Sequence, residues 1–382
     1  MVALTSHRPL FSRDLHFNDN SKENMSEIIL PNKKFNFPSD FGSHPEMAIE
    51  WWYLTGWLRD LDNKDLGFQI TFFRFKTGFS AQMNKSFDSS QIIFAHCALS
   101  LPAVGKLISI SKIARPGLAN VKFSNKDMYL SFENITFYRL KETGKYYLMV
   151  NEPDFSLKLI ASPPSVNGSF LQPILQGEKG FSQKGPDSKF ASYYYSRPNL
   201  ITKGTLKIKK DSPVKGIGWL DHEWTNNLLM KDFIGWDWVG INLIGGESLM
   251  VFRLRKADGS TGWADQSYFD KNQIKRSIKE FRKEKMMESL IDYRNDKLIL
   301  WNAKRVWASP RSAAKYPVEQ YLYFYGKKFH IVPLFEDQEV DATDSTGNFY
   351  WEGAVKLFEG NIEIGRGYME LTGYDKPLLI GF

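Results

Sequence analysis

The chain has 382 residues, enough for two domains that each bury a core, and its hydrophobic share of 42% and charged share of 24% exclude an intrinsically disordered protein. A single cysteine, Cys97, excludes an intramolecular disulfide and a cysteine-based zinc site. The net charge of +7 only weakly favours an acidic partner, because no nucleic-acid-binding motif accompanies it, and no nucleic-acid partner is expected.

Along the chain, residues 1–34 are predicted to form a flexible N-terminal arm, because they are charged and lack the apolar stretch of a secretory signal. No window holds the roughly 18 apolar residues that a transmembrane helix needs. Short segments of alternating branched or aromatic residues follow, separated by Gly, Asn, Asp and Pro, and this pattern predicts antiparallel strands. The predicted strands are residues 50–58, 67–75, 92–99, 128–137, 146–150 and 155–161.

Helical periodicity is scarce and is strongest at residues 274–290. The stretch 275–285 alternates charged and apolar residues, which predicts a solvated amphipathic helix or strand pair. The chain is therefore predicted to be all-β, a sandwich or a barrel.

The residue pattern of the first predicted hairpin recurs about half a chain later. The segment 51–58, which begins Trp-Trp-Tyr, leads to Phe73-Arg74, and Trp236-Asp237-Trp238 leads across Gly245-Gly246 to Phe252-Arg253. Two copies of one structural plan would explain this recurrence, although chance similarity of two hairpins is the alternative. Proline and glycine residues at 212–218 place the predicted boundary there, with domains at 35–214 and 215–382.

Longer motifs carry a resemblance to a known family. These are residues 40–46 (DFGSHPE), 50–56 (EWWYLTG), 220–224 (LDHEW), 235–238 (GWDW), 350–355 (YWEGAV) and 367–374 (GYMELTGY). In this order they resemble the carotenoid 1,2-hydratase-like and AttH-like family. The resemblance implies two tandem lipocalin-like (calycin) antiparallel β-barrels with few helices. It also implies a location in the periplasm or cell envelope, whereas the absence of a signal peptide in the chain as given allows a cytoplasmic one.

Three residues are candidates for catalysis. In an extended segment His222 and Trp224 share one face, and the resemblance implies that this His-x-Trp pair takes part in hydration, where an acid protonates an alkene and an aromatic ring stabilises the cation. The alternative for His222 is a structural histidine. The hydratases are thought to add a Tyr and an Asp one strand downstream, but residues 249–251 (Leu-Met-Val) contain neither.

Glu50 is the third candidate for catalysis, because an apolar face would raise the pKa of its carboxyl group. An ion pair with Arg74 or Arg253 is the alternative.

Four residues are candidates for ligand binding: Trp52, His96, Asp237 and Trp238. Trp52 shares the face of Glu50, and Trp238 lies in the aromatic strand of the second, repeated hairpin. The alternative for His96 is a core histidine, and Asp237 could instead face the other side of its strand. Metal-ligand spacings, phosphate loops and nucleophile elbows are absent from the sequence, so no metal and no cofactor are expected.

Together these patterns predict a two-barrel protein that encloses a hydrophobic small molecule of isoprenoid or lipid type, with hydratase- or lyase-type acid–base chemistry. The competing hypothesis is a non-catalytic carrier of hydrophobic ligands in the cell envelope. The sequence leaves the oligomeric state and the ligand's identity undetermined.

Overall fold

The computed structural model describes residues 29–76, 91–116, 119–273, 300–324 and 327–378. It confirms the all-β prediction, since these residues form two antiparallel sheets and, as helix, only the 3-10 turn η1 (Ser39–Phe41). No helix within these ranges is long and apolar enough to cross a membrane. Most of the predicted arm and the predicted helix at 274–290 lie outside the described residues.

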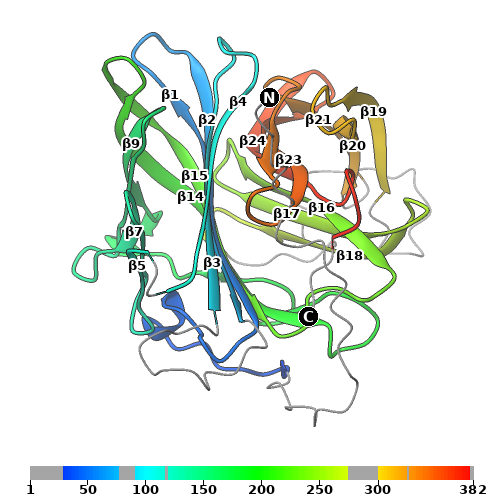
Figure 1. Cartoon of the computed structure of the whole chain (residues 1–382), viewed down its shortest axis with the longest axis horizontal. Helices are drawn as coiled ribbons and strands as arrows, with labels where there is room; N and C mark the ends of the chain where they lie inside the picture. Colours follow the sequence, from blue (N-terminus) through cyan, green and yellow to red (C-terminus); the bar gives the residue numbers. More distant parts are fainter. Residues whose placement is uncertain (1–28, 77–90, 117–118, 274–299, 325–326, 379–382) are drawn as a thin grey trace, which may run out of the picture.

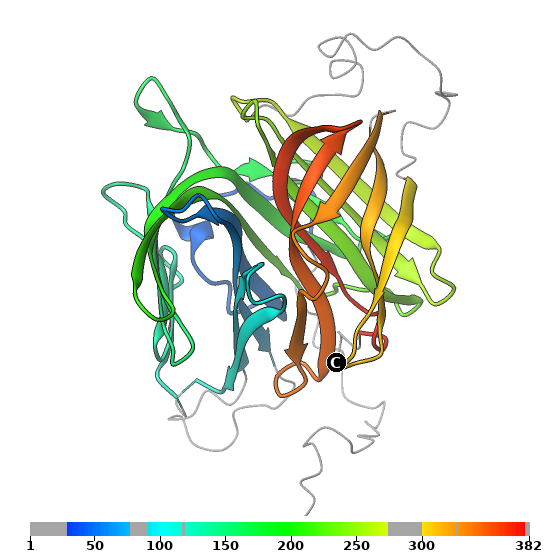
Figure 2. The ribbon, with the colours of Figure 1, turned by 90° about the horizontal axis from the view of Figure 1, so that it is seen from above.

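The first sheet curves into a nearly closed barrel, seen in blue, cyan and green in Figure 2. Its main strand order is β4-β3-β2-β1-β15-β14-β9-β8-β7-β6-β5. Its strands are β1 (Ile49–Arg59), β2 (Asp65–Lys76), β3 (Gln91–Ser100), β4 (Leu107–Ala114), β5 (Val121–Phe123), β6 (Tyr129–Phe132), β7 (Ile135–Arg139), β8 (Tyr146–Asn151), β9 (Ser156–Ser162), β12 (Ile174–Leu175), β13 (Phe181–Gln183), β14 (Ala191–Lys207) and β15 (Asp211–Thr225). A separate small hairpin joins β10 (Ser165–Val166) to β11 (Ser169–Phe170).

The second sheet forms a half-barrel that packs beside the β1, β2, β14 and β15 wall of the first (Figures 1 and 2). Its main strand order is β18-β17-β16-β24-β23-β21-β20-β19, with β22 pairing with β23. Its strands are β16 (Phe233–Leu243), β17 (Ser248–Lys256), β18 (Thr261–Phe269), β19 (Leu300–Ala308), β20 (Lys315–Phe324), β21 (Lys327–Pro333), β22 (Glu339–Ala342), β23 (Asn348–Glu359) and β24 (Ile362–Leu371).

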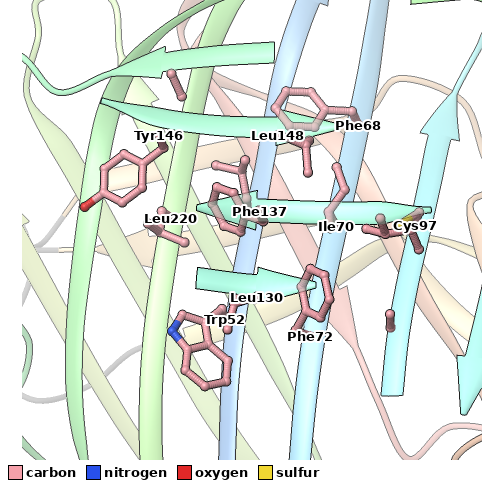
Figure 3. Packing of buried hydrophobic residues seen from close by; sticks show 14 of the residues in the cluster. Trp52, Phe68, Ile70, Phe72, Cys97, Leu130, Phe137, Tyr146, Leu148 and Leu220 are labelled. Carbon is pink, nitrogen blue, oxygen red and sulfur yellow. The ribbon is translucent and has the colours of Figure 1, made fainter. Parts of the chain in front are cut away.

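Side chains fill the interior of the first barrel. Alternation along β1 sends Trp52 and Leu54 into this core, where they meet residues of strands on the opposite wall. Figure 3 shows Trp52 and Leu220 on the long strands, with Leu130 and Phe137 on the strands that cross them. Cys97 is a buried free thiol in the same core, as expected.

The other face of β1 is buried as well. Tyr53 and Trp57 point away from the barrel core and form a second apolar cluster with Trp238 and Tyr368 of the second sheet. The Trp57 indole N–H donates to the Gly367 carbonyl oxygen at 2.8 Å, so the contact between the sheets is specific. The wall shared by the two sheets is therefore buried on both sides.

Two predicted boundaries differ from the structure. Residues 128–137 form a hairpin, not one strand, because the chain turns at Glu133, which has a φ of 51°. The predicted domain boundary at residues 214 and 215 falls inside β15, which pairs with β1 and β14 in the first sheet. Gly216 does not end a domain there; it permits close strand approach, because a Cβ would collide with the Trp57 carbonyl group. The chain passes between the sheets at residues 226–232.

Candidate functional site

A pocket lies between the two sheets. It is partly open, has a volume of about 80 Å³, and is walled by β1, β2, β14 and β15 on one side and by β16, β17, β23 and β24 on the other. Its lining residues are Ile49, Trp51, Tyr53, Thr71, Phe73, Phe75, Lys184, Tyr194, Asp221, Glu223, Leu228, Leu229, Trp236, Trp238, Phe252, Leu254, Glu352 and Glu370. The pocket is thus aromatic and, unexpectedly for an apolar site, holds four carboxyl groups.

Strand alternation decides which side chains reach the pocket. On β15, Asp221 and Glu223 face it, whereas His222 and Trp224 point to the opposite side of the strand. On β23 and β24, Glu352 and Glu370 are direct cross-strand partners and both line it. Side chains that stand directly opposite in an antiparallel pair lie about 5 Å apart at their Cβ atoms, so these two carboxyl groups are neighbours.

Glu352 and Glu370 are held in environments that favour their neutral forms. Burial raises the pKa of Glu370 to about 7, although the Trp236 indole N–H, which donates to Oε2 at 2.9 Å, acts in the opposite direction. Burial, reinforced by the charge of Glu370, raises the pKa of Glu352 well above its ordinary value. Because two neighbouring carboxyl groups resist being ionised together, the pair retains a proton more readily than isolated glutamates do.

Asp221 is held by donors on its own side of the pocket. Its Oδ1 accepts from Ser196 Oγ at 2.5 Å and from Trp219 Nε1 at 2.8 Å, and its Oδ2 accepts from the Tyr194 hydroxyl at 2.8 Å. Burial raises the pKa of Asp221 to about 7 despite these hydrogen bonds, which favour the carboxylate. Asp221 is therefore a second group able to exchange a proton near neutral pH.

Glu223 differs because it has a cation of its own. The Lys184 ammonium lies 2.8 Å from Glu223 Oε1 and 4.2 Å from the centre of the Phe252 ring. Within the described ranges, no lysine, arginine or histidine forms an ion pair with Asp221, Glu352 or Glu370. These three carboxyl groups are the unpaired acids of the pocket.

His222, Trp224 and Glu50 do come together, but inside the first barrel. Glu50 is fully buried and accepts from His222 Nε2 at 2.9 Å, from His44 Nδ1 at 2.7 Å and from Arg74 Nε at 2.9 Å. Trp224 stacks on the His44 ring with centroids 3.8 Å apart. Each of these groups is thus engaged with protein neighbours, on the face of β15 that points away from the pocket.

The protonation states in this network follow from its hydrogen bonds. Burial would raise the pKa of Glu50, but hydrogen bonds from His222 and His44 and the Arg74 charge lower it instead, so the expected rise is wrong and the alternative of an Arg74 ion pair is confirmed. Burial lowers the pKa of His222 to about 4, so this ring is neutral, donating from Nε2 and accepting at Nδ1 from the Tyr195 hydroxyl. Burial opposes charge on His44, but hydrogen bonds to Asp40 and Glu50 raise its pKa.

Among the described residues, His44, Glu50 and His222 could together offer ligands to a metal ion, since their ligand atoms lie within 4.8 Å of one another. Two imidazoles and a carboxylate form a donor set that zinc accepts. Here, however, both ring nitrogens of His44 face carboxylates, and Arg74 holds the second oxygen of Glu50. A cation would displace these bonds and lie beside a guanidinium, so the geometry favours a hydrogen-bonded network over a metal centre.

The residues predicted to bind ligand are dispersed. Trp238 lines the pocket, whereas Trp52 is buried in the first barrel, stacked on His222 at 4.5 Å. Asp237 faces the interior of the second sheet, where Arg253 and Arg255 pair with it. His96 bridges the sheets, with Nδ1 2.9 Å from the Tyr350 hydroxyl and Nε2 2.8 Å from Ser345 Oγ.

The acids of the pocket were missed, although the sequence held a signal for them. Asp221, Glu352 and Glu370 all stand inside the motifs that carry the family resemblance, next to residues expected in a core. In a strand buried on both faces, a carboxylate beside a core residue must also be buried. Such a carboxylate merits inspection as a functional group.

Fold and pocket define the class of protein: an all-β chain of two antiparallel sheets with an aromatic, acidic pocket between them. The chain belongs to the AttH-like family, whose profile matches residues 28–374. It is similar to the crystal structure of a proposed AttH from Nitrosomonas europaea, with 39% identity over 91% of this chain and 99% of that one and a TM-score of 0.77.

More distant structures share only the fold. Kievitone hydratase from Nectria haematococca is 13% identical, with a TM-score of 0.59 over 92% of this chain and 96% of that one. CghA in complex with Sch210972 is also 13% identical, with a TM-score of 0.51 over 87% of this chain and 89% of that one. No functionally curated protein matches the chain.

Proposed function

We propose that the protein binds a hydrophobic ligand of isoprenoid or lipid type in the pocket between its sheets, and that Glu370 acts there as a general acid in hydratase- or lyase-type chemistry. One observation carries the proposal: Glu370, with a pKa of about 7, faces a pocket lined by Trp51, Trp236 and Trp238. A general acid works best when its pKa lies near the working pH, and apolar surroundings set that value here.

The proposed hydration is a balanced addition of water to an alkene. The Glu370 carboxyl proton moves to one alkene carbon, and the positive charge left on the other carbon is stabilised by the neighbouring aromatic faces. A water molecule then forms the new C–O bond, and its proton passes to a carboxylate of the pocket, either Glu370 or Asp221. The reverse sequence is the lyase reaction. The kievitone hydratase likeness agrees with this chemistry but, at 13% identity, extends to the fold alone.

A carrier without chemistry is the second candidate. It is favoured by the network of His222, Trp224 and Glu50, since the groups expected to catalyse are engaged with one another and lie off the pocket. In this interpretation the three residues stabilise the barrel and the pocket only binds. A location in the cell envelope stays a prediction of the family resemblance.

The test combines binding with turnover. Titration with a fatty acid and a linear polyene should quench tryptophan fluorescence, because Trp51, Trp236 and Trp238 line the pocket. Glu370→Gln should lower any hydration rate by about 100-fold or more while ligand affinity changes little. Glu142→Gln, at an exposed turn, is the matched control. A flat fluorescence response would refute the proposal; binding without turnover would support the carrier.

A further inference from the structure

The pocket contains more carboxyl groups than cations. Buried carboxylates elsewhere in the described chain, such as Glu50 and Asp237, have arginine partners at 2.9 Å or less. Asp221, Glu352 and Glu370 have none within the same ranges, yet all three face one pocket. Burying an ionised carboxyl group without a counter-charge is unfavourable, so three in one place indicate a site that a cationic ligand completes.

Two further polar groups, one on each wall, lack a hydrogen bond of good geometry. The Tyr53 hydroxyl and Glu352 Oε1 belong to residues that are only 6% and 2% exposed, and their polar neighbours are each other and, for Glu352, the Tyr350 hydroxyl. Both residues line the pocket. Unsatisfied buried polar atoms are rare in folded proteins, so these two point to a ligand or bound water.

Both walls supply aromatic faces to the pocket. Trp51 of the first sheet and Trp236 of the second are partly exposed to the pocket, and Trp238 and Phe252 of the second sheet complete its aromatic lining. Aromatic faces attract cations, most strongly in sites that are shielded from water. Acids and aromatic faces around one small space are the combination that binds an organic ammonium group.

Lys184 demonstrates this combination within the protein itself. Its ammonium group lies 4.2 Å from the Phe252 ring centre and 5.1 Å from that of Tyr194, and it pairs with Glu223 at 2.8 Å. A lysine of this chain thus fills one end of the pocket as a cation between aromatic rings and a carboxylate. The end formed by Glu352 and Glu370 offers the same chemistry and has no internal cation.

We propose that the pocket recognises a hydrophobic ligand by a compact, positively charged head group, an organic ammonium seated between the tryptophans and the Glu352–Glu370 pair. The inference rests on the proposed ligand-binding role of the pocket and names the class of ligand. The pocket volume of about 80 Å³ suits a compact head whose apolar tail extends beyond it. The same surroundings would stabilise the carbocation of the hydration reaction, so a quaternary ammonium would then act as its mimic.

Binding of the cation should be linked to loss of a proton. The ionisable groups that face the pocket are Asp221, Glu223, Glu352, Glu370, Lys184, Tyr53 and Tyr194. Of these, Asp221 and Glu370 have pKa values of about 7, so their ionised fractions rise between about pH 6 and about pH 8. Ammonium affinity should therefore rise over this interval, whereas the affinity for a neutral ligand should not.

The experiment compares three probes of similar chain length on the full chain: octyltrimethylammonium, 1-nonanol and nonanoate. Fluorescence titration at about pH 8 should show octyltrimethylammonium binding at least roughly tenfold more tightly than 1-nonanol, with nonanoate weakest. The double substitution Glu352→Gln/Glu370→Gln keeps the side-chain shape but removes the ionisable groups, so it should weaken octyltrimethylammonium binding far more than 1-nonanol binding and abolish the preference. Glu142→Gln should keep the preference.

Each outcome separates this inference from the proposed function. Equal affinities for ammonium and alcohol would overturn the inference while leaving an apolar binding pocket, and failure of every probe would remove both. A preference that survives the double substitution would overturn the role of the glutamates. If the double variant loses 1-nonanol binding, Glu370→Gln alone is tested, with near-UV circular dichroism as a folding check. A folded Glu370→Gln variant that keeps the full preference for octyltrimethylammonium over 1-nonanol would overturn the inference.

Discussion

Glu50 lies at the centre of a buried network that joins the segment before β1 to strands β2 and β15. It contacts His44, Arg74 and His222, which come from these three parts of the chain. A carboxylate in this position neutralises a guanidinium and satisfies two imidazole N–H groups. Its role in stability is therefore better supported by the contacts than a role as an acid.

We expect Glu50→Gln to lower the free energy of unfolding by roughly 3–5 kcal/mol, because Arg74 would remain buried without a counter-charge. Urea denaturation at about pH 7 measures this loss. Glu142→Gln, an exposed substitution of the same kind, should change it by less than about 0.5 kcal/mol. A loss at Glu50 no larger than at Glu142 would mean that the network contributes little.

His96 provides a test of pH dependence. Burial lowers its pKa from the ordinary 6.5 to about 4. As the pH falls below 6.5, the unfolded chain therefore takes up a proton that the folded chain does not, and the folded state loses stability by up to about 1.4 kcal/mol per pH unit. We expect His96→Asn to make the stability curve between pH 6.5 and about 4 shallower than in the wild type. Parallel curves from urea denaturation would contradict this assignment.

At the scale of elements, β1 and β2 show why several strands look uniformly hydrophobic. One face of each packs into the first barrel, and the other meets the second sheet or the pocket between the sheets. Gly67 on β2 lies where the two sheets approach closely, because a Cβ there would collide with the Tyr368 hydroxyl and lie 2.8 Å from Ala354 Cβ. The glycine is required by a neighbour, not by a turn.

We expect substitutions at Gly67 to destabilise the protein in order of size. Gly67→Ala should lower the free energy of unfolding by about 1–3 kcal/mol and Gly67→Val by more, because each forces β2 away from β23 and β24. Thermal unfolding followed by circular dichroism measures the series. A Gly67→Val variant as stable as the wild type would show that the sheets can separate there without loss.

At the scale of the molecule, the two sheets share too much surface to behave independently. Besides the apolar cluster around Trp57 and Trp238, the Trp263 indole N–H donates to the Gln183 carbonyl oxygen at 2.8 Å, and Arg366 pairs with Asp65 at 3.0 Å. Either sheet alone would expose these aromatic residues to water.

We therefore expect the full chain to unfold in a single transition in differential scanning calorimetry, with the calorimetric enthalpy equal to the van't Hoff enthalpy. Loss of the apolar cluster on separation is the physical reason, since burial of apolar surface dominates folding free energy. Two resolved transitions, or an enthalpy ratio well above one, would show that the sheets unfold separately.

The local sequence pattern was sufficient to predict the strands and to assign side chains to the two faces of each strand. Alternation at residues 50–58 and 146–150 predicted β1 and β8, and it correctly separated His222 and Trp224 from Asp221 and Glu223. These features follow from the two-residue repeat of an extended chain, which requires no knowledge of distant residues.

Only the tertiary structure decided which faces meet. The pairing of β15 with β1 set the limit of the first sheet, and the packing of the sheets brought Asp221 to the same pocket as Glu352 and Glu370, more than a hundred residues away. Period-two alternation assigns a residue to a face but is silent on whether that face meets a core, a pocket or water. For this reason the sequence determined an all-β chain of the AttH-like family, while the location of its acids, and the chemistry proposed for them, came from the contact between its two sheets.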